Sequence, residues 1–205
     1  FSISDIQHLV NNPYKILVEK IMGIESLPEL KSNLDNKDWG IYAHDVLQKF
    51  TEEYNYKIPK DAFNKFVAIN NMAIKKLSND PIIRTFWLYH FEKIGEWFIR
   101  VQSKKEKSDD IIAAETFGKF EINLFEKKYT ITAKADRIDK NSDGNLSIID
   151  YKTGSIPSWK SVEIGEFPQL PLEVLIAESG GFSDVPAQKV DEISYWKLSG
   201  VSENT

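Results

Sequence analysis

The chain has 205 residues, of which 41% are hydrophobic and 12% aromatic, and this composition suffices for the core of one folded domain. Its formal net charge of −5 at pH 7 excludes a strongly basic nucleic-acid binder, so contact with nucleic acid would require a local basic patch, a metal-bridged phosphate or a partner subunit. The chain contains no cysteine, which excludes disulfides, thiolate zinc sites and iron–sulfur clusters.

Neither a signal peptide nor an apolar run of about 18 residues is present, which predicts a cytoplasmic protein that does not enter a membrane. The chain starts at Phe1 without an initiator methionine, and we expect it to be a piece of a longer protein. Apolar residues recur at helical spacing up to about residue 110. Beyond that point apolar and polar residues alternate.

The helical part opens with a segment that Ser2 or Ser4 can cap and that continues to Ile21. Pro13 is expected to kink or split this segment, because proline removes a helical hydrogen bond. The polar stretch 29–38 predicts a loop.

Three further helices are predicted before the alternating part begins. One runs from about Gly40 to Tyr54, one follows a cap at Asp61, and one opens at Pro81. Trp87 and Trp97 lie at core spacing in the last of these, which predicts buried side chains. The charged run 104–110 predicts an exposed connection.

The second part alternates between apolar and polar residues and predicts strands. We expect strands at 117–125, 129–136, 146–151 and 192–198, a turn at 141–145 and a helix within 167–177. The whole chain, 1–205, is then one α/β domain with a mainly helical part (1–110) and a catalytic sheet part (111–205). Its core is a mixed sheet of about four or five strands flanked by helices, and a helical N-terminal lobe accompanies it.

Two acids and a lysine stand at the ends of neighbouring predicted strands. Asp136 ends one strand, Asp150 ends the next, and Lys152 shares the face of Asp150 because strand residues alternate between faces. Two carboxylates can hold a hard divalent cation, which polarises a phosphate and acidifies a water. The lysine adds positive charge where the transition state becomes more negative. The pattern predicts metal-assisted phosphodiester cleavage, and the bland alternative is a buried ion pair.

Several other polar residues have weaker signals. Glu115 precedes the first predicted strand and could join the acidic cluster, but it is interpreted as an exposed acid before the strand. Asp139 and Asp143 are interpreted as turn residues. Arg137 can reach a phosphate or pair with an acid, and the sequence leaves both open.

Aromatic and histidine residues complete the candidate set. Trp159 lies in a loop predicted at about 154–165, after the strand that carries Lys152, and is a candidate for stacking on single-stranded DNA, with Lys160 as a phosphate contact. A lone histidine such as His44 on an amphipathic helix is, by itself, more often a satisfied core or boundary residue.

Five blocks of the chain, in this order, resemble the RecB-type nuclease domain of the PD-(D/E)XK superfamily, and most of all the C-terminal nuclease domain of the AddB family of helicase–nuclease subunits. The blocks are residues 132–139, 148–154, 168–173, 180–182 and 195–200. The segments 4–7, 12–15 and 39–44 extend the likeness toward the N-terminus, so it covers nearly the whole chain.

The resemblance implies roles for individual residues. Asp136 and Asp150 would bind Mg²⁺ or Mn²⁺ together with the backbone carbonyl of Tyr151, and Lys152 would be the motif lysine. His44 would reach the metal from the helical part.

Two further features concern the family motif and its cofactors. Gln169 matches the glutamine of the family's Gln-x-x-x-Tyr motif, whereas Glu173 departs from its usual tyrosine. The absence of cysteine resembles the branch without an iron–sulfur cluster.

The implied activity is a Mg²⁺- or Mn²⁺-dependent deoxyribonuclease. We expect an exonuclease that acts on a single strand or a duplex end, in double-strand-break repair and recombination, beside a helicase–nuclease partner subunit. One alternative is a catalytically silent DNA-binding or scaffold module of the same fold. Another is a stand-alone endonuclease or toxin of the superfamily. A sugar- or nucleotide-processing enzyme lacks support, because the chain has neither a glycine-rich phosphate loop nor a serine elbow.

Overall fold

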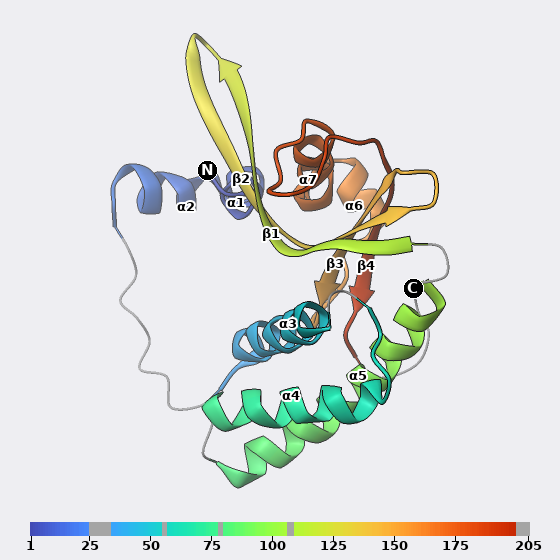
Figure 1. Cartoon of the computed structure of the whole chain (residues 1–205). Coiled ribbons are helices and arrows are strands. Elements are labelled where there is room, and N and C mark those ends of the chain that lie inside the picture. Colours follow the sequence, from blue (N-terminus) through green and yellow to red (C-terminus); the bar gives the residue numbers. More distant parts are fainter. Residues whose placement is uncertain (25–33, 55–56, 78–79, 106–108, 200–205) are drawn as a thin grey trace.

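The computed structural model describes residues 1–24, 34–54, 57–77, 80–105 and 109–199. A mixed sheet with strand order β1-β2-β3-β4 lies between two groups of helices (Figure 1). The predicted α/β class with a mixed sheet is therefore confirmed. The first part of the chain forms α1 (Ile3–Asn11), α2 (Pro13–Ile16), the π-helical turn η1 (Leu17–Ile21), α3 (Asn36–Glu53), α4 (Ala62–Leu77) and α5 (Pro81–Lys105). The second part forms β1 (Asp109–Leu124), β2 (Lys127–Asn141), β3 (Leu146–Lys152), α6 (Trp159–Glu163), α7 (Gln169–Glu178) and β4 (Val190–Lys197).

Local capping explains where the first helices begin. The Ser2 hydroxyl accepts from the Asp5 N–H, and the Asp5 carboxylate accepts from the Ser2 N–H, which is a capping box. Pro13 stands at the first position of α2, where its missing N–H costs nothing, and it splits the N-terminal helical segment as predicted.

The start of α3 differs from the prediction. The Asp35 carboxylate accepts from the N–H groups of Lys37 and Asp38, so the helix begins at Asn36 and includes the end of the predicted loop. This cap adds a full turn before Gly40. Residues 29–33 of the predicted loop lie outside the described residues.

The two faces of the sheet bury separate apolar clusters. Helices α3, α4 and α5 pack on the face that presents Ile149, Tyr151 and Trp196. Trp87 and Trp97 are buried in this cluster, as predicted. Helices α1, α6 and α7 supply the other cluster. No helix in the described part of the chain is long and apolar enough to cross a bilayer.

Strand β1 is longer than predicted. It pairs antiparallel with β2 from Asp109 to Leu124, with a register shift between Ile111 and Ala113. This irregularity breaks the alternation, and for that reason the pattern alone placed the start near residue 117. Asp109 is therefore not in an exposed connection: its largely buried carboxylate pairs with Lys105.

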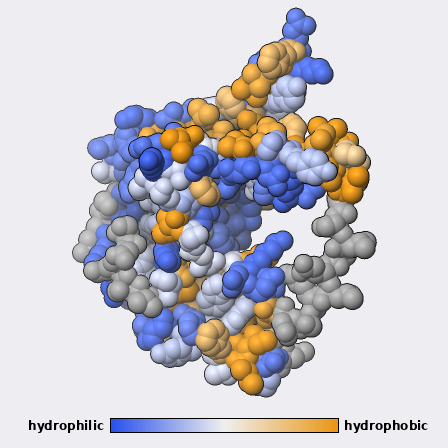
Figure 2. Space-filling view, turned by 180° about the vertical axis from the view of Figure 1, so that it is seen from behind, coloured by the Kyte–Doolittle hydropathy of each residue, from blue (hydrophilic) through white to orange (hydrophobic). Residues whose placement is uncertain are grey.

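The far end of the β1–β2 hairpin projects from the body as an arm (Figures 1 and 2). Its tip carries Phe125, which is 93% exposed. Apolar residues gather along this projection in the space-filling view, next to hydrophilic ones (Figure 2).

The interpretation of Asp139 as a turn residue is wrong. Asp139 lies in β2, is fully buried and accepts from Arg137 through Nε at 2.6 Å and Nη2 at 2.7 Å. The Arg137 guanidinium is 1% exposed and also lies 4.8 Å from the ring of Trp196. Arg137 therefore pairs with an acid rather than reaching a phosphate. The turn falls later, around Asp143, because β2 continues to Asn141.

We expect Asp139→Ala to lower the free energy of unfolding by about 3–5 kcal/mol, because it leaves a buried guanidinium without its partner. Asp143→Ala is the matched control on the exposed turn and should change it by less than about 0.5 kcal/mol. Urea titrations of both variants would measure this, and equal effects would contradict the assignment of Arg137 and Asp139 as a buried pair.

Candidate active site

The site forms where strands β2 and β3 diverge. Their pairing runs from Lys140 opposite Leu146 to Arg137 opposite Ile149, and beyond that point β2 continues beside β1. The backbone of Tyr151 therefore has no strand partner on the β2 side. Buried N–H and C=O groups require partners, and side chains supply them here.

Two predicted site residues satisfy the Tyr151 backbone. The Tyr151 N–H donates to Asp136 Oδ2 at 2.7 Å, and the Tyr151 carbonyl lies 3.2 Å from His44 Nε2. His44 reaches this point from α3, in the helical part of the chain. In this arrangement the Tyr151 carbonyl accepts a hydrogen bond from His44. The role of this carbonyl as a metal ligand stays a prediction.

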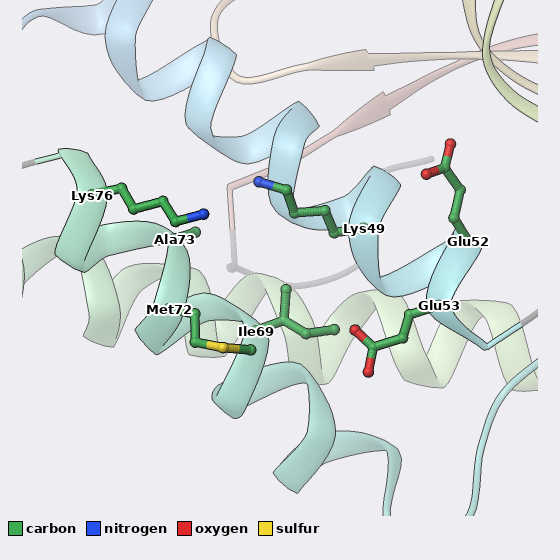
Figure 3. A pocket seen from close by; sticks show the side chains of 7 residues that line it. All are labelled: Lys49, Glu52, Glu53, Ile69, Met72, Ala73 and Lys76. Carbon is green, nitrogen blue, oxygen red and sulfur yellow. The ribbon is translucent and has the colours of Figure 1, made fainter.

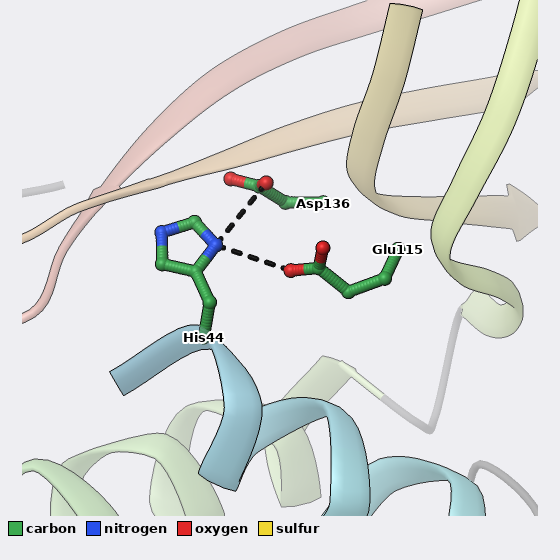
Figure 4. A group of neighbouring side chains, drawn as sticks. All are labelled: His44, Glu115 and Asp136. Atoms are coloured by element: carbon green, nitrogen blue, oxygen red, sulfur yellow. Dashed lines mark hydrogen bonds and ion pairs between the residues drawn. The ribbon is translucent and has the colours of Figure 1, made fainter. Parts of the chain in front are cut away.

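His44, Asp136 and Glu115 form one compact group of potential metal ligands (Figure 4). His44 Nδ1 lies 3.1 Å from Glu115 Oε1 and 3.2 Å from Asp136 Oδ1. One ligand atom from each residue falls within 4.8 Å of the others. Burial lowers the pKa of His44, but the hydrogen bonds and charges of Asp136 and Glu115 outweigh it and raise the pKa to about 10. An imidazolium thus stands between the two carboxylates, and a metal ion would have to displace its proton.

The interpretation of Glu115 as an exposed acid before the strand is wrong. Glu115 lies within β1, its side chain is 8% exposed, and Lys134 Nζ lies 2.5 Å from its second oxygen. Burial raises the pKa of Glu115, but His44 and Lys134 lower it by more, so it stays ionised. Its backbone is left-handed, with φ of 49°, a strain that is typical of functional sites. The apolar run 111–114 before this acid was the missed signal, because Asp150 follows a similar run.

The other predicted residues form a second group next to the first. Asp150 Oδ2 lies 2.7 Å from Lys152 Nζ, and Gln169 at the start of α7 accepts from Lys152 at 3.0 Å and donates to Asp150. Asp150 is therefore not part of the compact group around His44. Burial, and after it the charge of Asp136, raise the pKa of Asp150 to about 6.

Glu173 is a further buried carboxyl in this region. It lies one helical turn after Gln169, whose amide donates to it at 3.3 Å. Burial and the charges of Asp150 and Asp136 raise its pKa well above the usual range. This direction favours the neutral form of the residue that departs from the family's tyrosine.

Two concave surfaces lie next to the site. One of about 450 Å³ opens next to the compact group, and another of about 260 Å³ opens next to Gln169 and Glu173. A separate pocket between α3 and α4 (Figure 3) includes none of the predicted site residues. It is lined by Lys49, Glu52, Glu53, Ile69, Met72, Ala73 and Lys76.

Trp159 starts the short helix α6 rather than lying in a loop. Its half-exposed ring lies 5.6 Å from the ring of Tyr195, which in turn lies 5.7 Å from Lys152 Nζ. Trp159 is thus linked to Lys152 only indirectly, through the ring of Tyr195.

The family model of the PD-(D/E)XK nuclease superfamily matches residues 1–204. This chain belongs to the PD-(D/E)XK nuclease superfamily. The predicted family is confirmed, and so is the likeness to AddB, because B-type subunits of ATP-dependent helicase/deoxyribonucleases are among the relatives of this chain.

The relatives are longer proteins. The chain is 28% identical over 186 residues to an uncharacterized protein of Rickettsia conorii. This match covers 89% of this chain and 22% of that protein. It is 24% identical over 160 residues to the B-type subunit of the ATP-dependent helicase/deoxyribonuclease of Streptococcus agalactiae, covering 75% of this chain and 14% of that protein. The chain therefore spans about a fifth or less of the length of these relatives. A solved structure titled "Crystal structure of SSO0001" is 16% identical with a TM-score of 0.28 over 90% of this chain and 78% of that one, too low to carry an argument.

Glu115→Gln keeps the shape of the side chain and removes its charge. Loss of a partner in the outer shell of a metal site lowers metal affinity by roughly 10- to 100-fold. We expect the affinity of the Glu115→Gln variant for Mn²⁺ to fall by at least that much. Glu121→Gln, at an exposed position of the same strand, is the matched control and should bind as the parent does. Isothermal titration calorimetry measures both, and an unchanged affinity in Glu115→Gln would remove Glu115 from the ligand set.

Proposed function

We propose that this chain is a divalent-metal-dependent deoxyribonuclease domain. We further propose that it is an exonuclease and acts beside a helicase partner in the repair and recombination of DNA double-strand breaks. The observation that carries the proposal is the convergence of His44, Glu115 and Asp136 within 4.8 Å, next to the Asp150–Lys152 pair. Acids gathered in one place repel one another, and a bound divalent cation would offset that repulsion.

The donor set of the compact group suits Mg²⁺ or Mn²⁺. Carboxylate oxygens are the ligands of hard divalent cations, and an imidazole is tolerated by Mn²⁺ in particular. We assign the ligand role to Asp136, Asp150, Glu115 and His44, with the Tyr151 carbonyl as a further candidate. A bound cation would supply charge neutralisation at the phosphate and a more acidic water.

The remaining residues have roles that follow from their contacts. Lys152 would orient the attacking water, assist its deprotonation and offset negative charge as the water oxygen attacks phosphorus and the bond to the leaving oxygen breaks. Gln169 would hold Lys152 and Asp150 in place, because it bonds to both. Gln169 would in turn be held by Glu173, to which it also donates.

The relatives and the charge of the chain support a partner that delivers DNA. The Streptococcus agalactiae relative is named as one subunit of a helicase/deoxyribonuclease. Nonspecific affinity for DNA comes largely from neutralising phosphates, and a chain with net charge −5 has little of it.

The purified protein should be incubated with end-labelled single-stranded and double-stranded DNA in Mg²⁺, Mn²⁺ or EDTA. We expect cleavage in the presence of metal and none in EDTA, and the product ladder would give the polarity. Absence of cleavage, together with Mn²⁺ binding in the parent that Asp150→Asn abolishes, would indicate that a partner must deliver the DNA. Absence of both would favour a catalytically silent scaffold.

We expect Asp150→Asn and Lys152→Ala each to lower the rate of cleavage by at least about 100-fold, the loss typical when a charge-stabilising group is removed. Lys128→Ala, on the exposed hairpin, is the matched control and should cleave at the parent rate. Circular dichroism would establish that the variants are folded. Parent-like activity in either site variant would contradict the assignment.

A further inference from the structure

The cavity of about 260 Å³ next to Gln169 is lined in part by an aromatic side chain, that of Phe117, which has no role in the proposed catalysis. Phe117 of β1, Lys134 of β2, and Gln169 and Glu173 of α7 are among the residues that line it, together with residues at the start of α1. Small-molecule sites usually measure about 300–1,000 Å³, so this cavity suits part of a nucleotide rather than a whole cofactor. Lys134 also lines the concave surface beside His44, which makes the two spaces neighbours.

Phe117 is 66% exposed although it lies on a fixed part of the strand. The Phe117 carbonyl accepts from the Ser183 N–H at 3.0 Å. A Cβ at the next residue, Gly118, would lie 2.4 Å from the buried ring of Phe182, so the backbone cannot shift toward the core. The ring is therefore presented outward on rigid backbone, as binding sites require.

Exposed aromatic residues are ordinary on protein surfaces, and Phe125 at the hairpin tip is one of them. Two observations separate Phe117 from Phe125. Phe117 shares a cavity with the site residue Gln169, and the ammonium of Lys134, which pairs with Glu115, lies 5.4 Å from the centre of its ring.

Two lysines near Phe117, Lys119 and Lys134, can contact phosphates. Lys119 is exposed and follows Phe117 by two positions, so both side chains project from the same face of β1. A nucleic-acid strand offers what this face can bind, a flat apolar base with phosphates spaced along the chain. Bases inside a duplex are already stacked on their neighbours, so an unpaired base is required.

We propose that Phe117 is a specificity-determining residue that stacks on an unpaired base of DNA adjacent to the phosphate at the Asp150–Lys152 pair. This inference rests on the proposed nuclease function and adds to it a subsite for one nucleotide. Stacking on a single ring selects unpaired strands without selecting sequence, since every base has an aromatic face.

The test uses fluorescent single-stranded oligothymidylate and an abasic oligomer of the same length and charge, both in EDTA at low ionic strength so that no cleavage occurs. We expect Phe117→Ala to weaken binding of the oligothymidylate by roughly 5- to 100-fold, the range that stacking on one ring supplies. Binding of the abasic oligomer should not change. Phe117→Tyr should restore the affinity, and Phe125→Ala, the matched control, should bind both oligomers as the parent does.

Equal losses on both oligomers, or none on either, would overturn the stacking role, as would a parent protein that binds neither. Cleavage by the parent protein in Mn²⁺ is measured separately. A parent that cleaves while Phe117→Ala behaves like Phe125→Ala overturns only this inference. A parent that binds but never cleaves, alone or with a helicase partner, overturns the proposed function and leaves the binding result to stand on its own.

Discussion

The divergence of β2 from β3 is the constraint on which the candidate site depends. After Arg137 and Ile149 the two strands no longer pair, and the backbone of Tyr151 must find other partners. Asp136 and His44 supply them, and each is thereby held at a fixed point relative to β3. In β3, Asp150 immediately precedes Tyr151 and Lys152 immediately follows it. A single residue of β3 that lacks a strand partner on the β2 side thus places groups from β2, β3 and the helical part together.

Electrostatic repulsion explains why this arrangement is costly and what it is suited for. Four carboxyl groups, those of Glu115, Asp136, Asp150 and Glu173, lie within interaction distance of one another or of His44. The fold offsets this with Lys134, Lys152 and the imidazolium of His44. A divalent cation would relieve the same repulsion more completely, which is consistent with the metal use that is general in this superfamily.

Residues of the sheet could be predicted where a local pattern is strong. The acids Asp136 and Asp150 each follow an apolar run, and Lys152 shares a strand face with Asp150, so their proximity was predictable from alternation. Glu115 follows such a run as well, but a register shift hid the beginning of its strand. The prediction for Asp139 is wrong for a related reason. Residues around Asp143 predict a turn, but they do not show that β2 stays paired with β1 up to Asn141.

The sequence by itself determined the superfamily, through its motif blocks, the α/β class, and most helices and strands within a few residues, and it predicted the principal acids and lysine of the site. These properties depend on neighbours along the chain, that is on periodicity, capping and motif spacing. Only the tertiary structure decided that Glu115 joins His44 and Asp136, that Gln169 joins Asp150 to Lys152, and that Arg137 is buried against Asp139. Those contacts join residues from different elements or depend on which face of the sheet is covered, and the packing that brings them together leaves no periodic signal in the chain.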